Sequence, residues 1–454
     1  MPRRSPPVSG PPHFVWSFLL LFLLVPALAS CGEDAPTEEP VASWTLGAPT
    51  LRIGSLAGDE TALTTVGNLV VRDGTVFILQ PRDQTVRVFD DTGTFLRTIG
   101  QEGEGPGEFL GPSTLGFLGD TLWVGDSRLR RVTLFGRDGT VLEAFPFPLP
   151  NMGEALSAGF LGLTGGGGAL VSTSPAFRSE LDGTSHPFPL LSVSRDEDIR
   201  DTLATRDLAH ARGIMVTESQ GAIQSIEVFA QTFSDHTLVD LASEGGRIAV
   251  VERPVAASPD LATYRVSSVT ASGDTLFSVE VPYEPIPVPG ELVDSIVDRY
   301  AEGGRSRSRI RETLFLPDHY PPVSDVVAGE DGTVWVGREA GAGASRAWDV
   351  FGPDGTLLAR METPGAFRLH QAREGEVWGV LTDELDVPYV VRYPVVPHSS
   401  SPPSPSSSSS FSPSEASAPK RLSLSRSSIS LVMSGFSLRK ILAFSLPCPM
   451  RRSP

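Results

Sequence analysis

The segments "DGTVWVG" (Asp331–Gly337) and "VFGPDGTLLARM" (Val350–Met361) carry the two patterns from which the architecture follows. In the first, a glycine turn leads into a run of β-branched and aromatic residues, which is typical of a strand. In the second, Asp-Gly separates two apolar runs, a strong signal for a β-hairpin. Together they predict antiparallel strands joined by tight turns.

Both patterns recur along the chain. The first has six copies, which are "DGTVFIL" (Asp73), "GDTLWVG" (Gly119), "GGALVST" (Gly167), "GGRIAVV" (Gly245), "DGTVWVG" (Asp331) and "GEVWGVL" (Gly375). The second has four, which are "VFDDTGTFLRTI" (Val88), "LFGRDGTVLEAF" (Leu134), "VTASGDTLFSVE" (Val269) and "VFGPDGTLLARM" (Val350). A spacing of roughly 45 residues is the period of a four-stranded propeller blade. Wider gaps between the third, fourth and fifth copies predict insertions.

The two ends of the repeat region complement each other. The last blade offers three strand segments, "FRLHQAR", "GEVWGVLTDE" and "PYVVRYPVV", which end at Val396. The missing fourth strand can come from "WTLGAPTLRIG" (Trp44–Gly54), which would remove the exposed sheet edges. We therefore predict an all-β, six-bladed β-propeller over 44–397, with an amino-terminal strand that closes the last blade.

Two stretches resemble known propellers. "IGQEGEGPGEFLGP" (Ile99–Pro112), followed by "GDTLWVGDSRLRRVTLFGRDG", resembles the NHL-type six-bladed β-propeller. The part from "YPPVSDVVAGEDGTVWV" to "TDELDVPYVVRY" is similar to a group of exported bacterial propellers, many of them predicted lipoproteins of unassigned function. The resemblance is specific for the fold but says little about the activity, because one fold hosts many functions.

The amino end has the layout of an export signal. Arg3 and Arg4 precede an apolar run, and Leu28, Ala29 and Ser30 stand directly before Cys31. This pattern resembles the bacterial lipobox, which implies a signal peptide over 1–30, a lipid on Cys31 and a tether over 31–43. Gly32 in place of aspartate then implies transport to the outer membrane. Ordinary secretion and an uncleaved membrane anchor are the alternatives. We expect a lipid-anchored protein of the bacterial cell envelope.

The carboxyl end differs from the rest of the chain. From His398 it is rich in Ser and Pro, which favours a disordered tail over 398–454. Lys420 and Lys440 are the only lysines of the chain, so we interpret the tail as an addition that is not native to the fold. The alternative is a basic tail that touches the membrane.

Composition limits the partners. The chain has a formal net charge of −17 and only two cysteines, Cys31 and Cys448, so no disulfide framework is expected. Without the basic tail and signal the balance is about −25, which argues against nucleic acid. We expect a monomer that binds an envelope protein, a peptide or a glycan.

One insertion is predicted to be helical. "PGELVDSIVDRYAEGG" (Pro289–Gly304) places apolar residues at helical spacing, and a second short helix follows within 289–316. Its four arginines are candidates for partner contact, and a solvated face with internal salt bridges is the alternative; they are Arg305, Arg307, Arg309 and Arg311.

Signals for catalysis are weak. The resemblance to NHL propellers includes a lyase with histidine-bound zinc, but His186, His210, His236, His319 and His370 do not recur at one blade position. His319 and His370, near predicted inner strands, are the remaining metal candidates. Lactonase-like six-bladed propellers hold calcium with Glu, Asp and central asparagines, but this chain has only Asn68 and Asn151. Asp could substitute, and the acidic stretches at 195–201 and 383–386 are candidates for weak calcium binding. No nucleophile elbow or cofactor motif is present.

We therefore predict a binding or scaffold module and assign no catalytic residue or cofactor, with calcium or zinc as the candidates if there is one. A metal-dependent lyase or hydrolase with its site in the central channel is the alternative. A secreted sensor domain is a third hypothesis.

Overall fold

The computed structural model describes residues 41–398, except for 59, 155, 176–186, 207–211, 220–221, 256–261, 303, 340–344 and 374. Within this part, 212–219, 222–230 and His398 are described by their backbone alone. The lipobox, Cys31, the tether up to Pro40, His186, His210 and the tail from Ser399 on lie outside the described residues.

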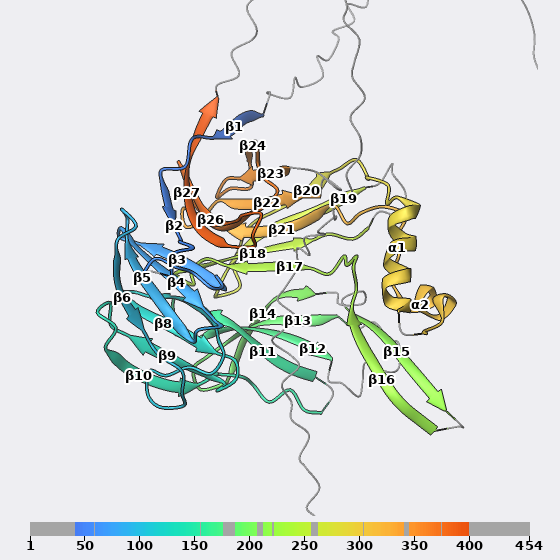
Figure 1. The fold of residues 1–454 in the computed structure, drawn as a ribbon, viewed down its shortest axis with the longest axis horizontal. Coiled ribbons are helices and arrows are strands. Elements are labelled where there is room, and N and C mark those ends of the chain that lie inside the picture. Colours follow the sequence, from blue (N-terminus) through green and yellow to red (C-terminus); the bar gives the residue numbers. More distant parts are fainter. Residues whose placement is uncertain are drawn as a thin grey trace, which may run out of the picture. The chain divides into compact units, whose positions relative to one another are not determined.

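Most of the described chain forms antiparallel four-stranded sheets (Figure 1). Blade 1 is β3 (Asn68–Arg72), β4 (Thr75–Gln80), β5 (Thr85–Asp90) and β6 (Phe95–Ile99). Blade 2 is β7 (Pro112–Leu118), β8 (Thr121–Asp126), β9 (Arg131–Phe135) and β10 (Val141–Pro146). Blade 3 is β11 (Leu156–Leu163), β12 (Ala169–Pro175), β13 (Phe188–Val193) and β14 (Ile199–Arg206). Blade 4 is β17 (Leu238–Leu241), β18 (Arg247–Glu252), β19 (Thr263–Thr270) and β20 (Thr275–Pro282).

The last two blades share one nine-stranded sheet. Blade 5 is β21 (Val323–Ala328), β22 (Val334–Arg338), β23 (Ser345–Phe351) and β24 (Leu357–Pro364). Blade 6 is β25 (Phe367–Arg373), β26 (Glu376–Thr382) and β27 (Pro388–His398), completed by β2 (Leu51–Ile53). The predicted closure by an amino-terminal strand is confirmed. In addition, β1 (Ala42–Leu46) pairs antiparallel with β27 and parallel with β24, so it joins blades 5 and 6.

The repeats map onto the blades as predicted. Each of the six glycine-led copies forms the second strand of a blade, and each of the four copies with a Gly-centred turn forms a hairpin of the third and fourth strands. The structure is a six-bladed β-propeller. A hairpin of β15 (Arg212–Ser219) and β16 (Ala222–Ala230), inserted between blades 3 and 4, was not predicted.

Apolar clusters fill all six interfaces between neighbouring blades. Between blades 1 and 2 the rings of Phe77 and Phe117 meet edge to face at 5.2 Å, and between blades 2 and 3 Trp123 meets Phe160 at 6.0 Å. Further buried clusters join blades 3 and 4, 4 and 5, 5 and 6, and 6 and 1. Burial of apolar surface between blades therefore closes the ring.

The first strands of the blades line the centre of the ring. β3 contacts β25 and β7, β7 contacts β11, and β21 contacts β17 and β25. The bond between Gln371 near the end of β25 and Val71 near the end of β3 shows that neighbouring first strands run in the same direction. The turns from first to second strand therefore lie together on what we call the turn face. The connections that lead into each first strand lie opposite, on the start face.

The insertions belong to the start face. Helices α1 (Gly290–Ala301) and α2 (Arg307–Thr313) lie between β20 and β21, which confirms the predicted helical insertion. They enclose a small core with Phe233, α2 contacts β15, and Figure 1 shows these elements on one side of the blades. Backbone bonds from Val288 to Asp318 and from Tyr320 to Ile286 fix the base of the insertion. Among the described residues, no helix has the length and apolar character to cross a membrane.

Candidate functional site

The turn between β17 and β18 crosses the centre of the ring at the turn face. Its backbone bonds to two other blades: the N–H of Phe117 donates to the Ser243 carbonyl at 2.8 Å, and the N–H of Gly165 donates to the Gly245 carbonyl at 2.9 Å. Gly245 has φ +69°, and a Cβ there would lie 2.4 Å from the Leu163 carbonyl oxygen. Only glycine fits this crossing without a shift of the backbone.

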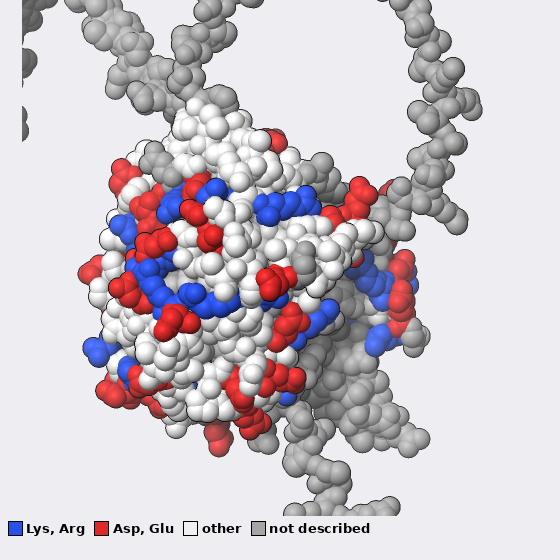
Figure 2. Space-filling model, turned by 60° about the vertical axis from the view of Figure 1, so that its left-hand side comes forward, with Lys and Arg blue, Asp and Glu red and all other residues white. Residues whose placement is uncertain are grey.

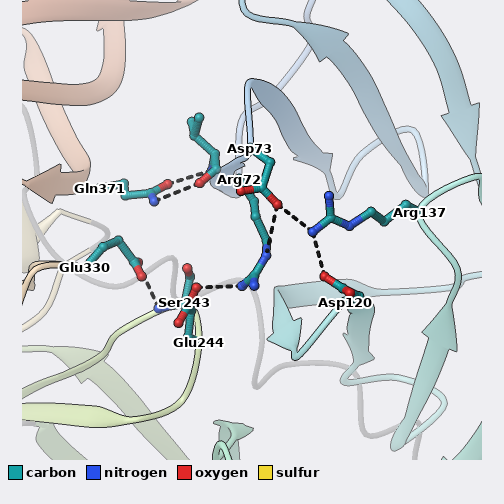
Figure 3. Close-up of polar contacts among 9 residues, drawn as sticks. Arg72, Asp73, Asp120, Arg137, Ser243, Glu244, Glu330 and Gln371 are labelled. Carbon is teal, nitrogen blue, oxygen red and sulfur yellow. Dashed lines mark hydrogen bonds and ion pairs between the residues drawn. The ribbon is translucent and has the colours of Figure 1, made fainter.

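Charged side chains complete the closure (Figure 3). Arg72 Nη1 of blade 1 lies 2.6 Å from Glu244 Oε1 of blade 4, so this ion pair joins two blades that face each other across the ring. Glu330 Oε1 of blade 5 accepts the Ser243 N–H at 3.1 Å. The β17–β18 turn is thus held by blades 1, 2, 3 and 5.

A second ion-pair group lies beside it. Arg137 Nη2 is 2.6 Å from Asp73 Oδ2 and 2.8 Å from Asp120 Oδ1, and the Arg137 hydrogen bond lowers the pKa of Asp73. Figure 2 shows the general pattern on one face of the molecule, where basic side chains form a curved band with acidic side chains next to them. On this face the charges are interleaved.

Two polar contacts join neighbouring inner strands. Gln371 of β25 accepts the Val71 N–H at 2.6 Å and donates to the Val71 carbonyl at 3.1 Å. Asp240 of β17 accepts the Ala328 N–H of β21 at 2.8 Å. Burial, together with the nearby charge of Asp325, raises the pKa of Asp240 to about 7, although the bond from the Ala328 N–H acts in the opposite direction. Asp240 can therefore hold or release a proton near neutral pH.

Toward the start face, the inner strands carry a group of charged side chains. Asp325 of β21 accepts from Arg346 Nη1 at 3.0 Å, and its side chain is 32% exposed. Burial nevertheless raises the pKa of Asp325, while Arg346, Arg368 and Arg253 lower it. Partial exposure together with desolvation fits a side chain at the centre of a ring, where it meets solvent but is surrounded by protein.

Arg368 and His370 of β25 belong to the same group. Arg368 donates from Nη2 to the Val66 carbonyl at 2.8 Å and from Nε to His370 Nε2 at 3.0 Å. Burial and the Arg368 charge lower the pKa of His370 to about 3, so this imidazole is neutral at physiological pH. His370, a predicted metal candidate, thus offers one ring nitrogen to an arginine.

The other histidines lie elsewhere. His236 is also neutral, since burial lowers its pKa to about 3, and its Nδ1 lies 2.6 Å from Ser234 Oγ. His319 forms a β-bridge with Pro287 at the base of the helical insertion. In the described part of the chain, no three His, Cys, Asp or Glu side chains come together as a metal site would need.

The acidic stretches form turns where they are described. Asp383 Oδ1 accepts the N–H groups of Leu385 and Val387, at 2.9 and 3.0 Å, and such bonds lower its pKa. In 195–201, Arg195 pairs with Glu143 and lies 4.0 Å from the centroid of the Phe145 ring. These contacts fit solvated turns.

The helical arginines make contacts within the insertion. Arg307 and Arg311 of α2 both pair with Asp294 of α1, and Arg307 also pairs with Asp298. Arg305 Nη1 donates to the Glu302 carbonyl at 2.7 Å, and Arg309 is exposed. The pairing matches the alternative stated above, a solvated face with internal salt bridges.

The sequence analysis did not single out Asp240, Asp325, Arg346 or Arg368. A signal for Asp240, Asp325 and Arg368 exists, because a charged residue inside the first strand of a blade, as in "VSDVVA" and "FRLHQAR", is unusual for a buried strand. Arg346 lies in the third strand of blade 5 and has no such signal.

Comparison with known proteins supports the fold. The family DUF5128, described as a 6-bladed beta-propeller, matches residues 57–116. These residues hold blade 1 and most of β7. No curated protein matches the chain.

Several solved structures are similar. An exported-protein candidate from Bacteroides fragilis has 14% identity and a TM-score of 0.42, over 79% of this chain and 96% of its own. A member of the DUF4221 family from Bacteroides vulgatus has 9% identity and a TM-score of 0.42, over 78% and 99%. A virginiamycin B lyase from Staphylococcus aureus has 12% identity and a TM-score of 0.37, over 78% and 100%. At these identities the likeness concerns the fold alone.

The turn that crosses the ring yields a first prediction. Gly245→Ala should lower the free energy of unfolding by about 3 kcal/mol, because alanine is strained at this φ and its Cβ meets the Leu163 carbonyl. Gly246→Ala is the matched control, since no atom lies within 4 Å of its Cβ position. Urea denaturation measures both. Equal stability of the two variants would show that the crossing is not constrained.

Asp240 yields a second prediction. Its folded pKa of about 7 lies above the unfolded value of 3.8, so the folded state binds the extra proton and stability falls as pH rises between these values. Asp240→Asn keeps the acceptor for Ala328 and should be more stable than the unaltered protein at pH 8, by on the order of 3 kcal/mol, with a smaller difference at pH 5.

Chemical denaturation at both pH values measures this difference. Asp138→Asn is the control. Hydrogen bonds from Thr140 lower the pKa of Asp138, so the change in stability caused by this substitution should have the opposite sign. A difference for Asp240→Asn that does not change with pH would mean that Asp240 does not carry the proton.

Proposed function

We propose that this propeller is a binding module of the bacterial cell envelope, with its binding site at the start face. One observation supports this choice of face. The turn face is closed by the β17–β18 turn and the Arg72–Glu244 pair, whereas Arg368 and Asp325, toward the start face, are still accessible.

The arrangement of loops supports the same face. Both insertions, α1–α2 and β15–β16, leave the blades there, and they contact each other. A rigid frame with inserted elements around one face is the usual basis for binding in propellers. The ligand is a protein, a peptide or a glycan of the envelope, and the exposed arginines of α2 are the proposed contacts at the rim.

An enzyme is the second candidate, and one observation favours it. Asp240 and Asp325 are carboxylates on adjacent inner strands. Burial raises the pKa of both side chains, which is typical of residues that transfer protons in catalysis. For the metal-dependent lyase or hydrolase considered above, His370 would have to release Arg368 before its Nε2 could bind zinc. Elemental analysis of the purified full chain tests this, with about one zinc or calcium per chain expected for such an enzyme.

The choice of face can be tested by photo-crosslinking in the native host. Benzoylphenylalanine is placed at Arg82 or Glu102 on the start face, and at Asp91 or Asp138 on the turn face; all four positions are exposed. We expect a discrete crosslinked species from the start-face positions only. Crosslinks of equal yield from both faces, or from the turn face alone, would contradict the proposal.

The proposed lipid anchor on Cys31 is tested by a separate experiment. We expect the full chain to float with membranes in a density gradient after the signal peptide is removed, since two or more acyl chains anchor stably. Cys31→Ser should remain in the soluble fraction. If Cys31→Ser is cleaved and still floats, lipid on Cys31 does not hold the protein at the membrane.

A further inference from the structure

The first strands of the six blades each place one residue at the same level of the ring. In blades 1, 2, 5 and 6 the second strand has one buried aromatic residue, and the first-strand residue at this level pairs with the position two residues after it. In blades 3 and 4 the corresponding residues pair with Ser172 and Val251. All six lie within the first four residues of their strands, toward the start face. We call them the start-face layer; in blade order they are Asn68, Thr114, Gly159, Leu238, Asp325 and Arg368.

The two charged residues of this layer point toward the next blade. Arg368 of blade 6 donates from Nη2 to the Val66 carbonyl, just before β3 of blade 1, at 2.8 Å. Asp325 of blade 5 lies on the same side of its sheet as Trp348, because a Cβ added at Gly337 would meet both side chains, at 3.1 and 3.3 Å. Trp348 belongs to the core between blades 5 and 6. Asp325 therefore faces the blade that carries Arg368.

Polar residues occupy one side of the start-face layer. We call them the polar arc; from blades 5, 6, 1 and 2 they are Asp325, Arg368, Asn68 and Thr114. All four are at least partly exposed, and their strands contact each other in this order, β21 to β25, β25 to β3 and β3 to β7. Blades 3 and 4 complete the layer with Gly159 and Leu238, of which the leucine is 8% exposed. A continuous polar side therefore lies opposite an apolar one.

The charged members of the polar arc can still bond to a ligand. Asp325 accepts from Arg346 Nη1 and from the N–H of the next residue, both at 3.0 Å. A carboxylate has about four acceptor sites, and this side chain is 32% exposed. In the described part of the chain, Arg368 uses two of its five N–H donors, in bonds to Val66 and His370.

The uncharged members also have free groups. Asn68 Oδ1 accepts the Leu69 N–H at 2.7 Å, whereas the amide N–H groups of Asn68 have no hydrogen-bond partner among the described residues. The same holds there for the Thr114 hydroxyl. The polar arc thus offers an acceptor at Asp325, donors at Arg368 and Asn68, and a group of both kinds at Thr114.

Opposite charges on neighbouring strands favour a neutral ligand. The charge of Asp325 would oppose an anion at Arg368, and the charges of Arg346 and Arg368 would oppose a cation at Asp325. A hydroxyl group carries no net charge and both donates and accepts, so it can bond to either side chain. Sugars combine such hydroxyl groups with C–H surfaces, which match the apolar side at Leu238.

We propose that the start-face layer binds a neutral glycan, whose hydroxyl groups bond to the polar arc and whose sugar ring contacts Leu238. This inference rests on the proposed function, because it selects one ligand class for the same face.

The test applies the purified full chain, in a detergent without sugar groups, to an array of neutral oligosaccharides, acidic oligosaccharides and peptides. We expect binding to at least one neutral oligosaccharide, which is then titrated into the protein by calorimetry. Binding to peptides or acidic oligosaccharides alone, or to nothing on the array, would overturn the proposal.

Two variants locate the site. Thr114→Val removes the hydroxyl and keeps the shape of the side chain, so it should weaken binding of that oligosaccharide about fivefold. Arg368→Gln should weaken it about tenfold, since bonds from a charged donor are stronger. Arg373→Gln is the matched control, because Arg373 is an exposed arginine at the turn-face end of the same strand, where it pairs with Glu376, and the affinity should be unchanged. If Arg368→Gln does not fold, Thr114→Val still tests the site.

The glycan and the binding face can fail separately. Start-face crosslinks together with no oligosaccharide bound on the array overturn the glycan and retain the face. Oligosaccharide binding that is unchanged in Thr114→Val and Arg368→Gln, or that falls equally in Arg368→Gln and Arg373→Gln, overturns the start-face layer as its site. Benzophenone reacts with the C–H bonds of a glycan as well as of a protein, so binding that the variants weaken, without start-face crosslinks in the host, would count against the proposed function instead.

Discussion

The pairing of β1 and β2 with β27 is the constraint on which the rest of the structure depends. Five blades form from strands close in sequence, but the last needs Leu51 to meet Arg392, at a cost in loop-closure entropy. The buried clusters around Trp44 and Ile53 offset that cost. The centre of the ring relies on this closure, since Gln371 and Arg368 of blade 6 bond to residues 71 and 66 next to it.

The two faces of the ring differ because their connections differ. The turns of the turn face are short and glycine-rich, and one of them, with Glu244 and Gly245, reaches across to the opposite blade. The connections of the start face carry the helices and the β15–β16 hairpin. A ring closed at one end and surrounded by insertions at the other offers its central side chains to ligands from one direction.

The fold could be predicted from the sequence because its signals are local. Gly-centred turns and apolar alternation mark four of the hairpins, and three strands in the last blade imply a fourth elsewhere. The β15–β16 hairpin has no such turn signal. The central site could not be predicted, since alternation shows only that Asp240 and Asp325 face one side of their strands. Which side chains they meet depends on ring closure. Of the two histidines predicted as metal candidates, His370 is neutral and accepts from Arg368, and His319 forms a β-bridge with Pro287.

The charges of the protein favour recognition of a ligand by direct contact over long-range electrostatic attraction of the ligand. The chain has a net charge of −17, so an approaching anion is repelled at long range. At physiological ionic strength this field is screened beyond about 8 Å, and at the ring centre Arg368 and the Asp325–Arg346 pair are charges that a ligand at the start face would meet directly. A ligand of the proposed binding face would then be selected by hydrogen bonds to side chains that are surrounded by protein, where such bonds are stronger than in water. Recognition by contact does not concentrate charged molecules at the surface, which suits the proposed role as a binding module.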